Sequence, residues 1–250
     1  MNYYAPNGLT FSVGSFPKQH WPATSLCVGG MRLPTVAELA SLLDCTKYPC
    51  TPTGIPDMPN AIFMTSDQLM TNFDASGQPY SFMGVDFDIG AVVSVQKSMI
   101  AYVLLVQGSL NTTLYFKMAD GLHRWGEVPD GGGWHVPTPG ELMRLLDYSK
   151  YPVTPANHPE VGAGMLWTNA ECLAPTLYGQ ALAVEFTGGR CNQTMKASML
   201  PVMLCKASGS VVVPPPVVNP PPPPPTPPTT GDMISRDHVL FLISDLMSKL

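Results

Sequence analysis

Charged side chains are scarce in this sequence. Asp, Glu, Lys and Arg make up 12% of its 250 residues, which is about half the share usual in soluble domains. The formal net charge is −5, and no run of Lys or Arg is present to contact phosphate groups. A nucleic-acid partner is therefore not expected.

Long apolar runs are also missing. The longest, residues 100–106, suits a buried strand and is far shorter than the roughly 20 residues that a membrane-spanning helix needs. Residues 1–16 contain no basic region followed by an apolar stretch, so a secretory signal is not expected. We predict that the chain does not insert into a membrane.

Catalytic motifs and metal-ligand spacings are absent as well. The sequence has no GxSxG, HExxH or phosphate-binding loop, and its five histidines are scattered. We therefore expect no enzyme activity, no cofactor and no metal site. We interpret the cysteines as buried free thiols, with a Cys45–Cys50 or Cys191–Cys205 disulfide as the alternative in an oxidising medium. The six cysteines are Cys27, Cys45, Cys50, Cys172, Cys191 and Cys205.

An internal repeat is the strongest signal that the sequence does contain. Residues 31–52 and 134–155 are identical at 12 of 22 positions with an offset of 103, whereas unrelated segments would match at about one or two positions. After a four-residue deletion, the alignment continues with an offset of 99. We predict two tandem copies of one domain, residues 1–110 and 111–209.

Each copy has the same predicted elements. Thr35 and Glu38, like Thr138 and Glu141, have the spacing of a capping box at the start of a helix. Leucines at spacings of three and four residues form an apolar stripe behind each box. The helix is expected to end near Asp44 and its counterpart, because the Lys-Tyr-Pro segment that follows disfavours helix. Everything downstream of the helix has the pattern of strands and loops: FMTS and LWTN begin strands, VDFD and VEFT alternate, and YVLLV and VMLCK are the strands that close each copy.

A proline-rich segment and a short helix are predicted after the second copy. Proline runs in residues 210–231 favour an extended polyproline II stalk, with a ligand for a partner's aromatic groove as the alternative. Residues 232–250 are predicted to form an amphipathic helix that needs a partner, since so short a helix is not stable alone. Its apolar face consists of Val239, Leu242, Ile243, Leu246, Met247 and Leu250.

The repeated motifs resemble those of the Lcl C-terminal domain family, small domains at the ends of collagen-like adhesins and in bacterial and phage proteins. The first copy carries MRLPTVAELASLLD, MTS, VDFDIG, Lys97 and YVLLVQ, and the second carries WHVPTPGELMRLLD, WTN, VEFTGG, Lys196 and PVMLCK. The resemblance implies an α+β fold, with a C-type lectin-like domain of one short helix and a twisted antiparallel sheet in each copy. It also implies extracellular binding, often of glycans.

Two pairs of acidic residues occupy matching positions in the copies. Asp86 and Glu185 lie on matching predicted strands, and Asp44 and Asp147 lie at matching helix ends. Such residues can bind Ca²⁺ or sugar hydroxyls; alternatively, they accept hydrogen bonds from turn amides or pair with the aligned lysines. The second interpretation is favoured, because no cluster of Asp, Asn or Glu accompanies them.

The candidate ligand-binding residues lie in the second copy. The four tryptophans of the chain can stack on sugar rings, with a position in the core for at least two of them as the alternative; they are Trp21, Trp125, Trp134 and Trp167. The candidates are Trp134, His135, Trp167, Asn169 and Arg190.

Three features together indicate a virion protein of a bacteriophage: an exported type of module without an export signal, a surface of low charge and a separate attachment segment. We expect a tail fibre, capsid fibre or decoration protein that binds other virion proteins through its C-terminal helix. The tandem module would then contact a host polysaccharide or surface protein. The alternatives are a purely structural virion subunit, a bacterial surface adhesin, self-association through the helix, and a relative of the formylglycine-generating enzymes. The last is disfavoured because the cysteines do not repeat.

Overall fold

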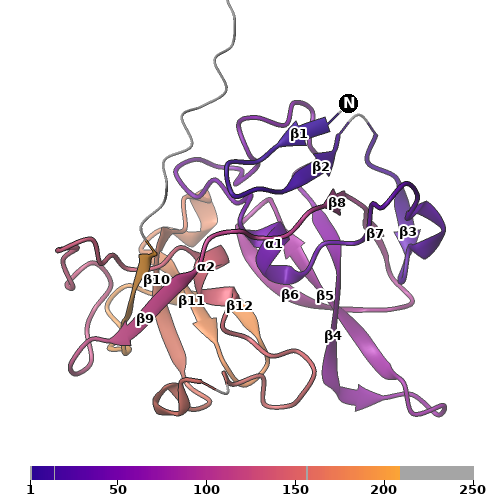
Figure 1. Ribbon diagram of the computed structural model, residues 1–250. Coiled ribbons are helices and arrows are strands. Elements are labelled where there is room, and N and C mark those ends of the chain that lie inside the picture. Colours follow the sequence, from indigo (N-terminus) through magenta and orange to yellow (C-terminus); the bar gives the residue numbers. More distant parts are fainter. Residues whose placement is uncertain (1, 14, 156, 209–250) are drawn as a thin grey trace, which may run out of the picture. The chain divides into compact units, whose positions relative to one another are not determined.

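Strands account for most of the regular structure of the protein (Figure 1). The computed structural model describes residues 2–13, 15–155 and 157–208. The predicted stalk and amphipathic helix, residues 210–231 and 232–250, lie outside the described residues. The described part is α+β with far more sheet than helix. No helix in it is both long enough and apolar enough to cross a membrane.

The two copies contain corresponding helices and strands. The elements of the first are β1 (Asn2–Tyr4), β2 (Thr10–Ser12), β3 (Lys18–His20), α1 (Val36–Ala40), β4 (Ile62–Phe73), β5 (Pro79–Asp86), β6 (Ala91–Gln96), β7 (Ile100–Tyr102) and β8 (Leu105–Gln107). The elements of the second are β9 (Leu114–Met118), α2 (Pro139–Met143), β10 (Met165–Glu171), β11 (Gln180–Glu185), β12 (Arg190–Met195) and β13 (Met203–Ala207). Short 3-10 turns lie at Thr24–Leu26, Pro159–Val161 and Pro175–Leu177.

The strands form three sheets. The largest is curled and has the strand order β10-β11-β12-β6-β5-β4-β7-β3 (Figure 1). Its neighbours are antiparallel except for β4 and β7, which are parallel at Phe63 and Tyr102. The smaller sheets are β1-β2-β8 and β13-β9. Both copies therefore contribute three consecutive antiparallel strands to one shared sheet.

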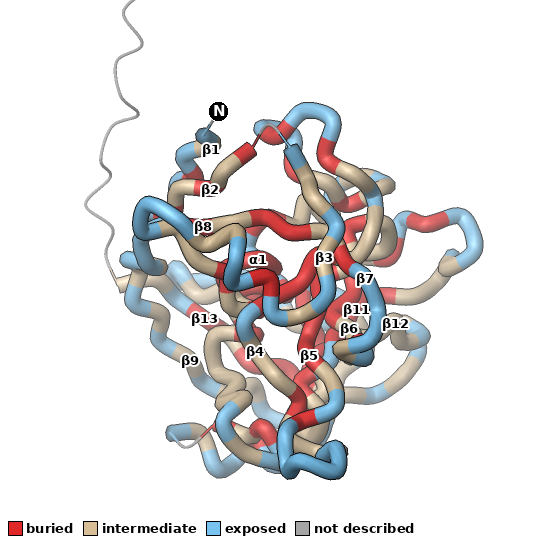
Figure 2. Tube along the Cα trace, turned by 90° about the vertical axis from the view of Figure 1, so that its right-hand side faces the viewer, coloured by how far each residue is buried: buried red, intermediate tan, exposed pale blue. Residues whose placement is uncertain are grey.

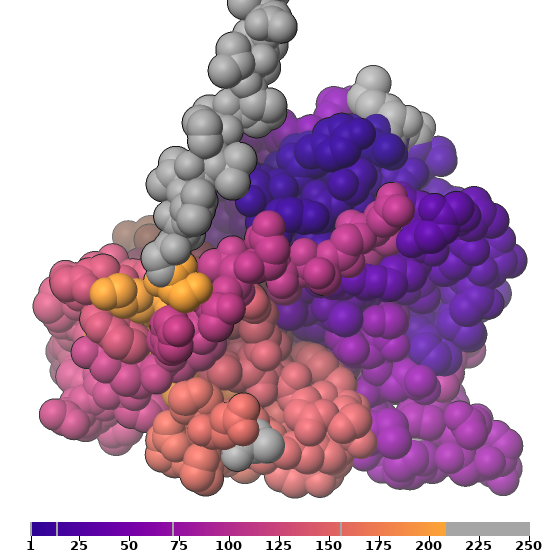
Figure 3. Space-filling model, viewed as in Figure 1, coloured from indigo at the N-terminus to yellow at the C-terminus, as the bar shows by residue number. Residues whose placement is uncertain are grey.

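The copies meet through equivalent elements. Strand β6 pairs with β12, and Val92 lies opposite Cys191, which is its own counterpart at the offset of 99. Helices α1 and α2 also pack against each other. Contact of each element with its own equivalent is the pattern of an isologous interface, so a pseudo-two-fold axis relates the copies at this junction. Figure 3 shows the chain between β8 and β9 crossing from one copy to the other.

One large hydrophobic core spans both copies. Leu39 from α1 and Leu142 from α2 are both fully buried in it, together with Val92 and Cys191 from the central strands. In Figure 2 buried segments gather around α1, β5, β6 and β11 in the middle of the molecule. Smaller apolar clusters lie on the far side of each copy's sheet, around Met64 and around Trp167. The two copies are thus joined by shared packing as well as by the chain.

The predicted capping boxes are confirmed at both helix starts. The side-chain oxygens of Thr35 and Thr138 accept hydrogen bonds from the backbone N–H of Glu38 and Glu141, and each Glu carboxylate accepts one from the Thr N–H in return. The helices end at Ala40 and Met143, about one turn earlier than predicted. After α1, the backbone hydrogen bonds span three residues instead of four: Leu42 N–H donates to the Leu39 carbonyl, and Leu43 N–H donates to the Ala40 carbonyl. The last turn therefore tightens before the Pro segment.

Candidate functional site

A tryptophan–lysine contact is repeated in the two copies. Lys97 Nζ lies 4.3 Å from the ring centroid of Trp21, and Lys196 Nζ lies 4.4 Å from that of Trp125. These distances are within the range of a cation–π contact. Each ammonium group also reaches a side-chain oxygen on the first long strand of its copy, namely Gln68 in one and Glu171 in the other. The aligned lysines are therefore used in the same way in both copies.

Hydrogen bonds hold these tryptophans in place. The indole N–H groups of Trp21 and Trp125 donate to the carbonyls of Thr65 and Thr168, both at 2.9 Å. The buried hydroxyls of Thr65 and Thr168 donate in turn to the neighbouring strand. These two tryptophans are not recognisable as a pair from the sequence, because they lie before the aligned blocks and at an offset of 104.

A small cavity lies beside this arrangement in the second copy. It has a volume of about 210 Å³, and its lining includes Trp125, Asp130, Thr168 and Asn169. Trp167, Val128, Val136 and Val202 supply apolar walls. The first copy has Met64 and Ser66 at the positions of Trp167 and Asn169, so the lining of this site differs between the copies.

The structure brings two of the five predicted ligand residues to this cavity. Asn169 is exposed at its edge. Trp167 also borders it but is 1% exposed, and its indole N–H donates to the His123 carbonyl at 2.9 Å. A ring packed in this way has no free face on which a sugar can stack, so Trp167 is a core residue. Trp125, which was one of four tryptophans considered for stacking, offers the half-buried ring instead.

The other three predicted ligand residues lie outside the cavity lining. Trp134 is half-buried beneath Lys117, whose Nζ lies 4.4 Å from the ring centroid. Arg190 is exposed at the start of β12, opposite Glu185. His135 belongs to a separate group at the start of α2. Trp134 and His135 precede α2, whereas Arg190 begins β12, and the spacing along the chain does not show how these segments lie relative to the cavity.

Two larger hollows lie near the junction of the copies. One, of about 510 Å³, is bordered by residues from both copies, including Asp67 and Tyr148. The other, of about 400 Å³, lies against the link between the copies and is bordered by Phe116 and His158. Arg144 borders both. Its guanidinium group donates to the Thr112 carbonyl and so joins α2 to the link.

The carboxylate of each capping box also bonds to a basic residue from the preceding segment. Arg32 donates two hydrogen bonds to Glu38, at 2.6 and 2.7 Å. Burial raises the pKa of Glu38, but the hydrogen bonds from Arg32 and Thr35 outweigh burial and hold the pKa below its usual value. In the second copy, His135 Nε2 lies 3.2 Å from both carboxylate oxygens of Glu141.

The paired acids act mainly in turns. The carboxylates of Asp44 and Asp147 accept hydrogen bonds from N–H groups two residues later, and hydroxyl donors in these turns lower the pKa of both. Asp86 accepts from the Asp88 N–H at 2.9 Å. The turn interpretation is thus confirmed for these three residues. The aligned lysines lie over the tryptophan rings described above and bond to Gln68 and Glu171 rather than to Asp86 and Glu185.

All six cysteines are free thiols. Four are buried, whereas Cys27 and Cys45 are half-buried. The Cys45 and Cys50 thiols both lie beside Gly90. Four of the six cysteines therefore match the prediction of buried free thiols.

Comparison of the chain with models of protein families and with curated proteins gave no match.

Proposed function

We propose that this protein is a non-catalytic virion component that displays two tandem lectin-like domains for binding to a host surface. It would be a phage tail fibre, capsid fibre or decoration protein. The motif resemblance, the repeated α+β units and the low charge of the chain support this proposal. The observation that carries it is the cavity of the second copy, which combines an indole ring with neutral and acidic hydrogen-bonding groups.

The lining of this cavity suits a sugar. Aromatic rings contact the apolar face of a pyranose, while amide, hydroxyl and carboxylate groups bond to its hydroxyls. Trp125, Asn169 and Asp130 supply these groups. The volume of about 210 Å³ is below the roughly 300–1,000 Å³ of sites for drug-sized ligands. The site would therefore hold one terminal or branching sugar residue of a longer polysaccharide.

Binding of the full chain to immobilised host polysaccharides tests this part of the proposal. Asn169→Ala and Trp125→Ala should each weaken binding by about two- to tenfold, the loss expected for one hydrogen bond or one stacking contact at a ligand. Ser66→Ala and Trp21→Ala are the matched controls in the first copy, and the tryptophan control loses the same internal contacts. If Trp125→Ala and Trp21→Ala weaken polysaccharide binding equally, and Asn169→Ala does not weaken it, the sugar site lies outside this cavity.

Attachment would depend on residues 232–250 rather than on the domains. The predicted apolar face has no partner within its own segment, so we expect it to bind another virion protein. Deletion of residues 232–250 should leave the tandem domains folded but abolish incorporation into particles. Leu242→Asp with Leu246→Asp should act likewise, because it places charges in a dehydrated contact. Unchanged incorporation of the truncated protein would contradict this assignment.

The main alternative is a purely structural virion subunit. Incorporation into particles without binding to any host polysaccharide or cell would favour it. Attachment to the surface of bacteria that carry no phage would favour a bacterial adhesin.

A further inference from the structure

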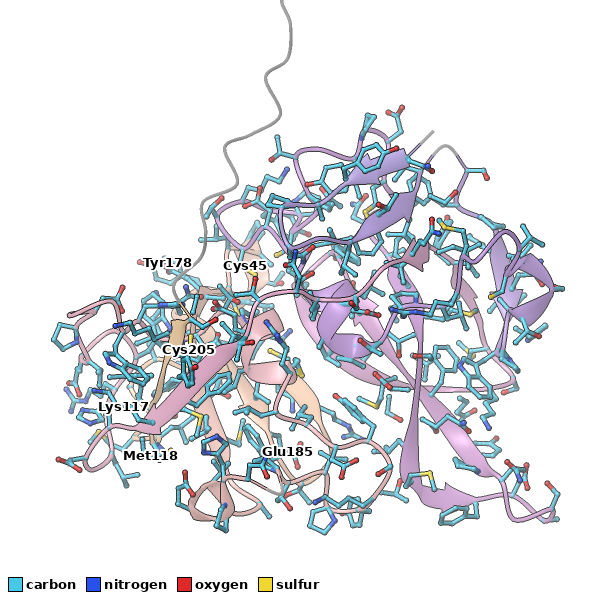
Figure 4. The ribbon with its side chains drawn as sticks, viewed as in Figure 1. Cys45, Lys117, Met118, Tyr178, Glu185 and Cys205 are labelled. Atoms are coloured by element: carbon cyan, nitrogen blue, oxygen red, sulfur yellow. The ribbon has the colours of Figure 1, made fainter. Side chains whose placement is uncertain are left out.

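Three side chains of different chemistry converge at the start of α2. His135 Nε2 lies 3.1 Å from Cys205 Sγ and 3.2 Å from the Glu141 carboxylate oxygens. One ligand-type atom from each residue lies within 4.8 Å of the other two. Figure 4 places Cys205 on β13, next to β9 and apart from Glu185. The group therefore contains none of the paired acids Asp44, Asp86, Asp147 and Glu185.

The backbone fixes the positions of all three residues. His135 and Cys205 form an antiparallel bridge with two reciprocal hydrogen bonds of 3.0 and 2.8 Å, so their side chains leave the bridge on the same face. Glu141 is held by the capping box, where its carboxylate accepts from the N–H and the hydroxyl of Thr138. Such hydrogen bonds are the usual support of a metal-binding carboxylate.

The first copy provides an internal comparison. Arg32 and Val106 form the same antiparallel bridge, with hydrogen bonds of 2.9 and 2.8 Å, and Arg32 forms an ion pair with Glu38 at 2.6 Å. The fold thus neutralises this capping carboxylate with a permanent cation in the first copy. The second copy replaces both the Arg and the Val, and each replacement is a residue that binds transition metals.

The geometry does not suit a catalytic relay. A Cys–His–acid nucleophile uses one ring nitrogen for the thiol and the other for the acid. Here Nε2 faces both Cys205 and Glu141. Atoms that point toward a common position are instead the arrangement of a chelate. A tetrahedral zinc ion holds its N, O and S ligand atoms about 3.4–3.6 Å apart, close to the distances seen here.

We propose that His135, Glu141 and Cys205 bind one zinc ion. The thiolate and imidazole ligands favour zinc over calcium or magnesium, which prefer oxygen ligands. A thiolate and a carboxylate together balance its two positive charges. The side chains of His135 and Glu141 are 35% and 25% exposed, which leaves access for the ion and for water as the fourth ligand. The nearby Arg144 is directed to the Thr112 carbonyl. This site is independent of the glycan cavity.

Titration of the metal-free full chain with zinc chloride, followed by calorimetry, tests the proposal. We expect one zinc ion per chain, with a thermal unfolding midpoint that rises as zinc is added. Cobalt substituted for zinc should give a thiolate-to-metal charge-transfer absorption that is lost in Cys205→Ser. That variant should bind zinc at least about tenfold more weakly, since losing a metal ligand lowers the affinity more than losing a hydrogen bond to a ligand does.

A matched double variant separates metal binding from folding. His135→Arg with Cys205→Val converts the trio into the arrangement of the first copy, so this variant should fold but bind no zinc there. Cys45→Ser with Cys50→Ser removes the neighbouring pair of thiols and should still bind one ion. If the His135→Arg, Cys205→Val chain binds zinc as tightly as the unaltered chain, the proposal is wrong. It is equally wrong if the Cys45, Cys50 variant alone loses the ion.

Discussion

Single side chains at the two helix starts show how one motif tolerates different neighbours. Thr35 and Thr138 form the same capping bonds with Glu38 and Glu141, although the basic residue beside the carboxylate is Arg32 in one copy and His135 in the other. The cap depends only on residues three positions apart, which is why it was predictable from sequence. The basic partner of each Glu comes from a different segment, so it was not predictable from the sequence.

Loss of the cap hydroxyl in the second copy should weaken folding. Thr138→Ala removes the acceptor for the Glu141 N–H, which lies 3.2 Å from Thr138 Oγ1. We expect the free energy of unfolding to fall by about 1 kcal/mol. Urea denaturation with a metal chelator present measures this without a contribution from bound metal. Thr113→Ala, in an exposed link position, is the control and should have a smaller effect. No loss of stability in Thr138→Ala would contradict the role of the cap.

Asp67 should make stability depend on pH. Burial raises its pKa from 3.8 to about 6, although its carboxylate accepts a hydrogen bond from the Val36 N–H at 2.6 Å. The folded state thus holds the proton more tightly than the unfolded state. Its stabilising contribution is complete below about pH 3.8 and is lost as the pH rises through about 6.

Asp67→Asn removes this titration and tests the assignment. The difference in unfolding free energy between this variant and the unaltered chain should shift in favour of the variant between pH 4 and pH 7, by an amount on the order of 1 kcal/mol. Chemical denaturation at several pH values measures that difference. Asp74→Asn is the control, because Asp74 is exposed and its pKa is lowered by hydrogen bonds from its own turn. A difference that stays constant with pH would contradict a buried, titrating Asp67.

At the scale of elements, the junction of the two helices depends on a glycine. A Cβ atom at Gly140 would lie 2.8 Å from the backbone N and Cα of Ser41, which follows α1 directly. Real Cβ atoms essentially never approach backbone this closely. Gly140 therefore permits α1 and α2 to approach each other at the pseudo-two-fold junction.

Gly140→Ala should therefore destabilise the protein, although alanine favours helix over glycine by about 1 kcal/mol. Overpacking of this kind costs about 1–3 kcal/mol, which exceeds the gain in helix propensity. Gly131→Ala is the control, since its added Cβ would meet no atom within 4 Å. Thermal and urea denaturation of both variants give the comparison. A stabilised Gly140→Ala protein would show that the helices can separate without cost.

The elements themselves were partly predictable. The leucine spacing and the capping boxes located both helices, and the apolar segments located β4, β5, β10, β11 and β13. The predicted closing strand of the first copy is divided into β7 and β8, which belong to different sheets. The three N-terminal strands β1–β3 were not predicted, because three-residue strands are too short to show a clear alternation. Pairing of β6 with β12 depends on contacts almost 100 residues apart, which no local pattern encodes.

At the scale of the whole molecule, neither copy has a complete core of its own. Leu39, Leu142, Val92 and Cys191 belong to one buried cluster drawn from both copies. Separated fragments 1–110 and 111–209 would expose these residues and the edges of β6 and β12. We expect each fragment alone to lack cooperative unfolding, and an equimolar mixture to regain it.

Circular dichroism and amide hydrogen exchange of the fragments and their mixture test this expectation. Residues 1–209 as one chain serve as the control, since they form a single compact unit. The Gly140→Ala change in fragment 111–209 should weaken association with the other fragment. Cooperative folding of either fragment in isolation would contradict the shared core.

The pairing of Val92 with Cys191 has a consequence for how the protein can change over generations. On the axis of a homodimer, a residue meets its own copy, so every substitution in the gene occurs twice at the same place. Here the two sides of the axis are encoded separately, and a valine meets a cysteine. A residue on one side of the axis can therefore be substituted while the residue opposite it is unchanged and still supports the junction. Because the two units are encoded separately in one reading frame, their sequences can diverge, and one half can acquire a chemistry that the other half lacks.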